Sequence, residues 1–133
     1  MKSLKADAYF NLCVVDVFKA RQFFEMLGFE IIEDYSDDKG FCLSLNERAY
    51  LMMLGTEKFE VFAKNTAVDS FKHTEVIFSF DVGSKEKVDQ LISMVKQLGG
   101  MEIGEAHQDE YMYYRSFRDL DGHHFEVFSM QKK

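Results

Sequence analysis

The feature that most constrains the fold of this chain is a repeat within it. Residues 27–32 read LGFEII and residues 98–103 read LGGMEI, so in two places a helix-ending glycine leads straight into a strand-like run. Apolar runs surround both segments in the same order. Self-similarity of this kind indicates two copies of one supersecondary unit. The sequence therefore predicts two modules in one domain, at about residues 1–65 and about residues 66–133.

Each module contains one amphipathic helix. Asp16 and Ser84 are residues that cap helix N-termini, and apolar side chains follow each of them at helical spacing. These side chains are Ala20, Phe23, Phe24 and Leu27 in the first helix, and Val88, Leu91, Ile92, Val95 and Leu98 in the second. Gly28 and the pair Gly99 and Gly100 are expected to end the two helices.

One strand-like run precedes each helix and three follow it. The expected strands are Ala8–Val15, Phe29–Tyr35, Gly40–Leu45 and Ala49–Leu54, then Thr74–Val82, Met101–Ala106, Glu110–Phe117 and His123–Met130. The order βαβββ, found twice, predicts an α+β fold whose curved mixed sheets surround a cup, with the helices outside. Between the modules, the polar segment Thr56–Lys72 is expected to be a linker with a short helix, or alternatively a lid over a ligand.

Composition limits the function classes. The chain has 133 residues, of which 47% are hydrophobic, and a net charge of −7. No cluster of Lys and Arg is present, which argues against partners such as nucleic acid or an anionic membrane. No apolar run approaches the ~18 residues of a membrane span. Cys13 and Cys42 lie in apolar runs and the N-terminal residues do not resemble a signal peptide, so we expect a cytoplasmic protein with two buried thiols.

Glu126 is the residue that most needs an explanation. Residues 117–128 read FRDLDGHHFEVF, in which Asp119, Asp121 and Gly122 supply turn chemistry and a strand follows. Alternation along that strand puts His124 and Glu126 on one face. A carboxylate on a half-buried strand costs free energy unless it has a metal, a hydrogen-bond donor or a ligand. The alternative is that Glu126 is solvated or paired with an arginine.

These features together resemble the vicinal oxygen chelate superfamily, which includes glyoxalase I, bleomycin and fosfomycin resistance proteins and extradiol dioxygenases. The resemblance rests on Asp16, the pair Phe23 and Phe24, the run 27–29, and the turn 119–122 followed by Glu126. The resemblance covers nearly the whole chain, and the chain is similar above all to small bacterial glyoxalase-like members without a defined substrate. It implies the fold rather than a reaction.

The resemblance implies four metal-ligand positions, one each on the first, fourth, fifth and eighth strands. Carried over to this chain, they fall on Tyr9, about Met52, Glu75 and Glu126. Tyr9 replaces the usual histidine and Met52 offers neither oxygen nor imidazole, so two of the four ligands are missing. Catalytic metals normally have about three protein ligands. The cofactor therefore stays unknown: a metal-free site is preferred, with a divalent ion as the alternative.

A rebuilt metal site is one alternative for the two glutamates. Strand alternation would place His73 beside Glu75 and His124 beside Glu126, and such a mixed set suits Zn, Ni, Mn or Fe. The two histidines would otherwise lie half solvated at strand ends. Without a metal, Glu75 and Glu126 facing each other would repel, which would raise the pKa of one and make it a candidate catalytic base.

Ligand-binding residues are expected on the cup faces of the strands. The polar face of the first strand carries Tyr9 and Asn11, and Met52 lies on the fourth. His73 and His124 are further ligand-binding candidates. In the seventh strand Tyr113 and Arg115 are assigned to the ligand, although the sequence leaves open whether they or instead Tyr114 face the cup.

Two function classes follow. The first is a small-molecule-binding protein with an aromatic, acidic cup and a degenerate metal site. The second is a divalent-metal-dependent lyase, isomerase or dioxygenase. Loss of the ligands at Tyr9 and Met52 favours the binding protein, whereas retention of Glu126 and Glu75 favours the enzyme. The resemblance also implies a homodimer, because curved half-sheets leave edges that a second copy can cover.

Overall fold

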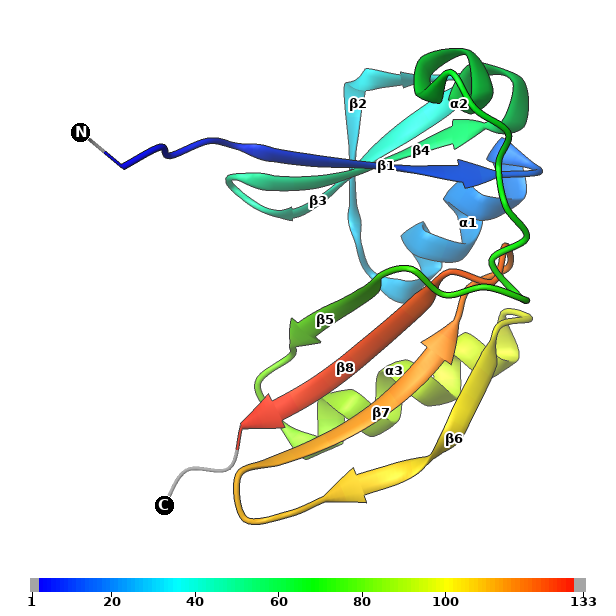
Figure 1. Cartoon of the computed structure of the whole chain (residues 1–133). Coiled ribbons are helices and arrows are strands. Elements are labelled where there is room, and N and C mark those ends of the chain that lie inside the picture. Colours follow the sequence, from blue (N-terminus) through cyan, green and yellow to red (C-terminus); the bar gives the residue numbers. More distant parts are fainter. Residues whose placement is uncertain (1–2, 131–133) are drawn as a thin grey trace. The chain divides into compact units, whose positions relative to one another are not determined.

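The computed structural model describes residues 3–130 and has the expected α+β architecture. The chain divides into two compact units, Met1–Ala67 and Val68–Lys133. Each unit has its own four-stranded sheet (Figure 1). The first unit contains β1 (Ala8–Val14), α1 (Val17–Leu27), β2 (Glu30–Asp37), β3 (Gly40–Asn46), β4 (Ala49–Gly55) and α2 (Thr56–Ala63). The second contains β5 (Ile77–Asp81), α3 (Lys85–Gln97), β6 (Met101–Gln108), β7 (Met112–Arg118) and β8 (His124–Met130).

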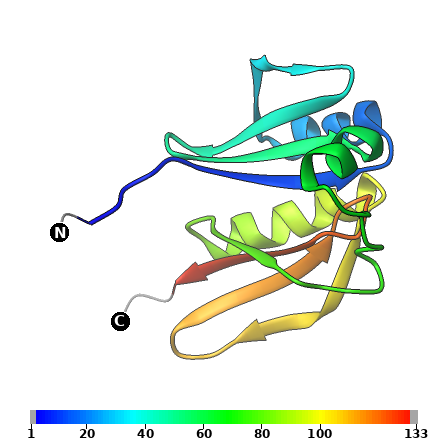
Figure 2. The same ribbon diagram turned by 45° about the horizontal axis from the view of Figure 1, so that its top comes forward.

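The two sheets share one topology. Their strand orders are β1-β4-β3-β2 and β5-β8-β7-β6. In each, the strand before the helix runs parallel to the last strand, and the other neighbours are antiparallel. Neither sheet closes on itself as a barrel, and α3 lies along one face of its own sheet (Figure 2). The predicted duplication of βαβββ is therefore confirmed.

The helices begin and end where their sequences indicate. The Asp16 carboxylate accepts a hydrogen bond of 3.0 Å from the Lys19 backbone N–H at the start of α1. Gly28 ends α1 with φ 101°, a left-handed conformation that glycine adopts without a Cβ penalty. Ser84 caps α3 in the same way as Asp16 caps α1, by accepting from the Lys87 N–H at 3.2 Å.

The helices α1 and α3 each cover one face of their own sheet. In α1, Phe24 is buried and its ring lies 6.3 Å from that of Phe41 on β3. In the second unit, Phe117 and Phe125 stack at 5.1 Å on the face that α3 covers. Burial of each such side chain stabilises the fold by roughly 1.5–3 kcal/mol. We call the opposite face of each sheet the distal face of that unit.

Three details differ from the sequence prediction or refine it. β5 starts at Ile77 rather than Thr74, so His73 and Glu75 lie in the connection before the strand. The linker does contain a helix, α2. Cys42 is fully buried, as expected, but Cys13 is only partly buried and its thiol contacts the Thr56 hydroxyl at 3.5 Å. Within residues 3–130, no helix has both the length and the apolar character needed to cross a membrane.

Candidate functional site

Strand register places Glu126 in the middle of the distal face of the second unit. It pairs with Ser79 on β5 and with Ser116 on β7, so a row of serine, glutamate and serine crosses three strands. Side chains directly opposite each other on neighbouring strands have Cβ atoms ~4.5–5.5 Å apart. Glu126 is half-buried, and among the described residues its carboxylate has no hydrogen bond or ion pair. It is therefore available to a ligand.

A second row of paired residues lies two residues before Glu126 along β8 and contains His124. It pairs with Ile77 on β5 and with Arg118 on β7. Burial, and then the charge of Arg118, lower the pKa of His124, so the imidazole is neutral near pH 7. His124 lies two residues from Glu126 on the same face, as predicted, and the neutral ring offers one donor and one acceptor.

The Arg118 guanidinium is hydrogen-bonded to backbone groups of the same chain. Its guanidinium donates to the carbonyl oxygens of Ser70 at 3.0 Å and Gly122 at 2.8 Å. These bonds attach the connection before β5 to the β7–β8 turn. Arg118 therefore holds the edge of the distal face in place, and its charge affects His124 from there.

The third row completes the distal face with aromatic side chains. Tyr114 on β7 pairs with Phe128 on β8, and both are partly exposed. The sequence left open whether Tyr114 or its neighbours faced this side, and the register now assigns Tyr114 to it. A ligand at Glu126 would thus meet a carboxylate, two hydroxyls, an imidazole and two aromatic rings.

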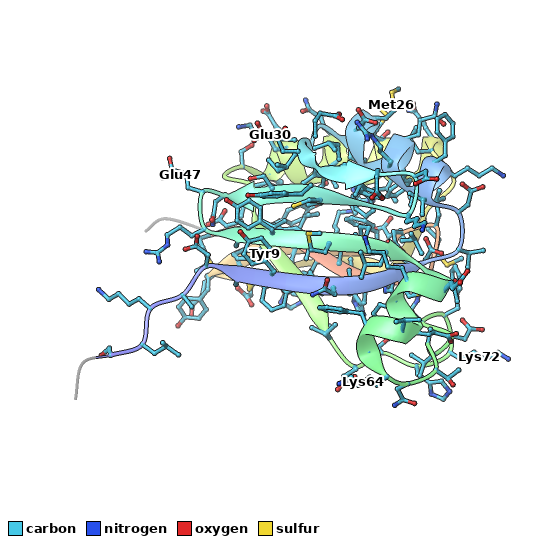
Figure 3. The ribbon with its side chains drawn as sticks, turned by 90° about the horizontal axis from the view of Figure 1, so that it is seen from above. Tyr9, Met26, Glu30, Glu47, Lys64 and Lys72 are labelled. Carbon is cyan, nitrogen blue, oxygen red and sulfur yellow. The ribbon has the colours of Figure 1, made fainter. Side chains whose placement is uncertain are left out.

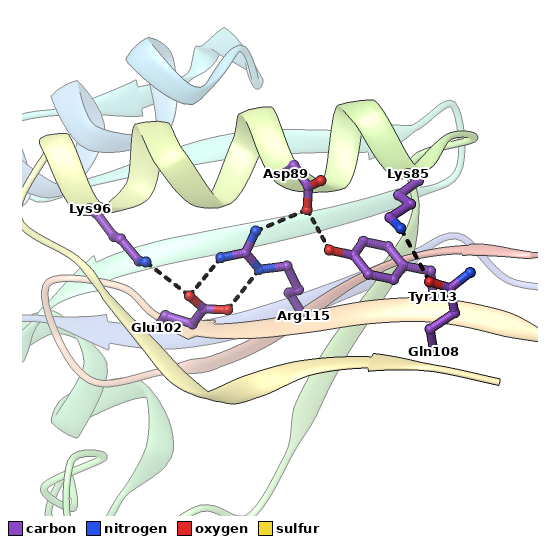
Figure 4. Close-up of polar contacts among 7 residues, drawn as sticks. All are labelled: Lys85, Asp89, Lys96, Glu102, Gln108, Tyr113 and Arg115. Carbon is purple, nitrogen blue, oxygen red and sulfur yellow. Dashed lines mark hydrogen bonds and ion pairs between the residues drawn. The ribbon is translucent and has the colours of Figure 1, made fainter.

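Tyr113 and Arg115 lie on the opposite face, against α3, so placing them in the cup was wrong. The Tyr113 hydroxyl donates to the Asp89 carboxylate at 2.5 Å, and Arg115 donates to Asp89 at 2.9 Å (Figure 4). Arg115 also makes two bonds of 2.7 Å to Glu102, and Lys96 pairs with the same carboxylate. The hydrogen bonds from Arg115 lower the pKa of Glu102 to about 2. The cluster attaches α3 to β6 and β7.

His73 and Glu75 do not join this face as strand residues. Both are exposed and precede the start of β5. Glu126 is opposite Ser79, four residues beyond Glu75, so the two glutamates are not neighbours in the sheet. The placement of His73 and Glu75 on the fifth strand was wrong because the pairing of β5 with β8 begins only at Ile77, which pairs with His124. Ile77 lies seven residues before the Ser84 cap, as Tyr9 lies seven residues before the Asp16 cap.

The distal face of the first unit carries the other predicted positions. Tyr9 pairs with Tyr50, and Asn11 pairs with Met52. All four share the face opposite α1, because the alternate residues Leu12 and Val14 are buried in the core. The rings of Tyr9 and Tyr50 stack with centroids 4.7 Å apart. Partial desolvation, followed by the neighbouring Tyr50 phenol, raises the pKa of Tyr9.

The donor set does not fit a divalent metal held by four protein ligands. The positions matched by register are Tyr9, Met52, Ile77 and Glu126, of which only Glu126 supplies a hard anionic oxygen. A phenol with a raised pKa and a thioether are weak ligands at neutral pH. Within residues 3–130, no three His, Cys, Asp or Glu side chains gather closely enough to hold a metal ion.

Comparison with known proteins identifies related structures. No protein-family model and no curated protein matches the sequence. A solved structure of a hypothetical protein from S. aureus is 30% identical with TM-score 0.80, covering 97% of this chain and 94% of that one. A glyoxalase/bleomycin resistance protein/dioxygenase family enzyme from Burkholderia phytofirmans is 20% identical with TM-score 0.80, covering 94% and 98%. The fosfomycin resistance protein FosX from Listeria monocytogenes is 21% identical with TM-score 0.64, covering 97% and 93%, and a variant of it was solved with Mn(II) and a dihydroxypropylphosphonic acid.

Proposed function

This chain belongs to the vicinal oxygen chelate superfamily, and we propose that it is a small-molecule-binding protein of the glyoxalase/bleomycin-resistance type whose metal site is degenerate. The observation that carries the proposal is the Glu126 carboxylate. It is half-buried and has no partner among the described residues, in a row with Ser79 and Ser116. A carboxylate in such a position is costly unless a ligand donor reaches it. The ligand would therefore present an N–H or O–H group to Glu126.

The neighbouring rows indicate the rest of the ligand. Tyr114 and Phe128 offer a flat apolar surface on one side of Glu126, and neutral His124 offers one donor and one acceptor on the other. Sites for small molecules commonly combine apolar walls with a few placed polar groups. An amphipathic molecule with one polar end fits this arrangement, and a positively charged donor would bind the carboxylate more strongly than a neutral one.

The alternative is a divalent-metal-dependent lyase, isomerase or dioxygenase of the same superfamily. One observation favours it: His124 and Glu126 are both metal-type ligands, two residues apart on one strand face. FosX, a structural neighbour, has been solved with Mn(II). Two ligands are fewer than the about three that a catalytic metal site normally has, so the binding function is preferred.

A ligand screen on metal-free protein tests the binding function. Protein treated with a chelator is screened against small amphipathic amines and alcohols by thermal shift and by NMR. We expect hits that shift resonances of β7 and β8 and that weaken about tenfold or more in Glu126→Gln, because a charge-assisted hydrogen bond is lost. Glu105→Gln, which changes an exposed carboxylate on β6, is the matched control. Hits that bind equally well to both variants, or no hits at all, would reject the proposal.

Assembly and location are part of the same proposal. We expect a cytoplasmic homodimer that binds neither nucleic acid nor membrane, consistent with a net charge of −7. Apolar side chains such as Val15, Phe18, Val61 and Phe62 are more than two-thirds exposed. A second copy could cover surface of this kind. Sedimentation at tens of micromolar, a range in which stable dimers persist, would give a dimer, and a monomer there would remove the claim.

A further inference from the structure

The first unit has a pocket of about 650 Å³ at the end of its distal face. Its lining begins where α1 ends, at Gly28 and Phe29, and continues along β2 with Glu30 and Ile32. The other wall is formed by the β3–β4 hairpin, from Ser44 through Glu47, and by Tyr50. The volume is in the range of small-molecule sites, ~300–1,000 Å³.

The electrostatics of this pocket have one sign. Glu30 and Glu47 are its charged lining residues, and no Lys, Arg or His lines it. Both residues are exposed and are labelled in Figure 3. Among the described residues neither carboxylate has an ion pair or hydrogen bond through its side chain. The C-terminus of α1 adds the negative end of the helix dipole, and the last turn of that helix has no basic residue. Three independent negative contributions therefore act on one small volume.

Tyr50 forms an aromatic wall of the pocket, and the chain itself holds its ring in place before any ligand binds. The ring of Tyr50 stacks on Tyr9 with an interplanar angle of 13°, and its hydroxyl donates to the Glu47 carbonyl oxygen at 3.0 Å. The Asn46 side chain stabilises the turn of the β3–β4 hairpin, because it accepts a hydrogen bond of 2.8 Å from the Arg48 N–H. Because the ring is held on one face and at its hydroxyl, a ligand would lose little entropy in ordering it. Aromatic faces attract cations within about 6 Å.

From this combination we propose that the pocket binds an organic cation, a protonated or quaternary amine with an apolar body. The amine would lie between Glu30, Glu47 and the end of α1, and the apolar body would pack on Tyr50, Ile32 and Phe29. This site is separate from Glu126 and does not depend on the function proposed for the second unit.

The test is an NMR titration of the full chain with three probes of similar shape. Benzyltrimethylammonium carries a positive charge, benzyl alcohol is neutral and benzenesulfonate is negative. We expect the cation to bind at least about tenfold more tightly than the alcohol, the sulfonate not to bind, and the shifts to lie at residues 28–32 and 44–50. Raising the salt to about 0.3 M should weaken the cation several-fold, because screening lowers the attraction.

Charge-neutralising variants separate this pocket from general acidity of the protein. Glu30→Gln and Glu47→Gln should each weaken cation binding about two- to fivefold, as expected for partly screened charges. Glu105→Gln removes the same charge from the second unit and should leave the affinity at this pocket unchanged. Equal affinity for the three probes, no shifts at residues 28–32 and 44–50, or an equal loss in Glu105→Gln would overturn the proposal. If the ligand screen at Glu126 fails while the cation binds this pocket, only the function proposed for Glu126 is rejected. If that screen succeeds while the cation does not bind here, only the pocket proposal is rejected.

Discussion

Arg115 on β7 donates two parallel hydrogen bonds of 2.7 Å to the Glu102 carboxylate on β6. Both side chains are less than a fifth exposed. The third nitrogen of the same guanidinium bonds to Asp89 on α3, so one cation joins the helix to two strands. A bidentate, partly buried pair of this kind is stronger than an exposed ion pair.

Arg115→Met should destabilise the protein by about 2–3 kcal/mol, because Asp89 and Glu102 lose their shared guanidinium and only Glu102 keeps a cation, Lys96. Urea unfolding measures the change. Lys85→Met is the control: its ammonium lies 4.8 Å from the centroid of the Tyr113 ring at the exposed end of the same cluster. It should cost less than about 1 kcal/mol. Equal losses in the two variants would contradict the central role given to Arg115.

Low pH should lower the free energy of unfolding through protonation of Glu102. Its pKa is lowered from 4.5 to about 2 by Arg115, so the folded state favours the charged carboxylate. The stability gained in this way is complete above the unfolded value near 4.5 and is lost as the pH falls toward about 2. Denaturation followed from pH 6 to pH 2 should show a steep loss that is flatter in Glu102→Gln. A slope that is the same in both proteins would show that other carboxylates dominate.

Asp119 should have the opposite effect on stability, because its contribution should fall as the pH rises. It is 2% exposed, one of its carboxylate oxygens has no hydrogen-bond partner, and burial raises its pKa to about 6. A raised pKa gives stability that is present below the unfolded value near 3.8 and lost as the pH rises through about 6. The stability of Asp119→Asn relative to the native chain should therefore improve by about 2–3 kcal/mol between about pH 3.5 and about pH 7.5. A constant difference across that range would reject the raised pKa.

Gly122→Ala should be among the most damaging single changes in the second unit. Gly122 has φ 88°, and a Cβ there would lie 2.6 Å from the Phe71 backbone nitrogen. Gly104 also has a positive φ, 66°, but a Cβ there meets nothing within 4 Å. Gly104→Ala should cost about 1 kcal/mol from backbone strain alone, and Gly122→Ala more than twice that. Thermal unfolding of the two variants compares them, and equal Tm losses would mean that the segment at Phe71 moves away freely.

The sequence was sufficient for the repeated fold but only in part for the site. The Asp16 and Ser84 caps are local signals with strong physical causes, and they located both helices correctly. The start of β5 was misjudged because residues 74–76 are compatible with a strand, while only tertiary pairing with β8 decides where pairing begins. That error placed Glu75 on a strand, facing Glu126.

The neighbours of Glu126 in the sheet depend on strand register rather than on any motif. Ser79 and Ser116 are unremarkable in the sequence and become neighbours of Glu126 only through pairing across three strands. Tyr113, Tyr114 and Arg115 are consecutive, so alternation alone could not decide which of them faced the helix. The acidic partners Asp89 and Glu102 on the α3 side were the missing signal.

The most direct test of the proposed function is a thermal-shift series on chelator-treated protein with Zn, Ni, Mn and Fe(II). A ligand at 100 times its Kd stabilises the folded state by about 2.7 kcal/mol, which is easily detected. We predict no such stabilisation by any of the four ions, while hits from the amine and alcohol screen do stabilise the native chain and not Glu126→Gln. Strong stabilisation by one of the ions that disappears in Glu126→Gln but persists in Glu105→Gln would contradict the metal-free site and favour the enzyme.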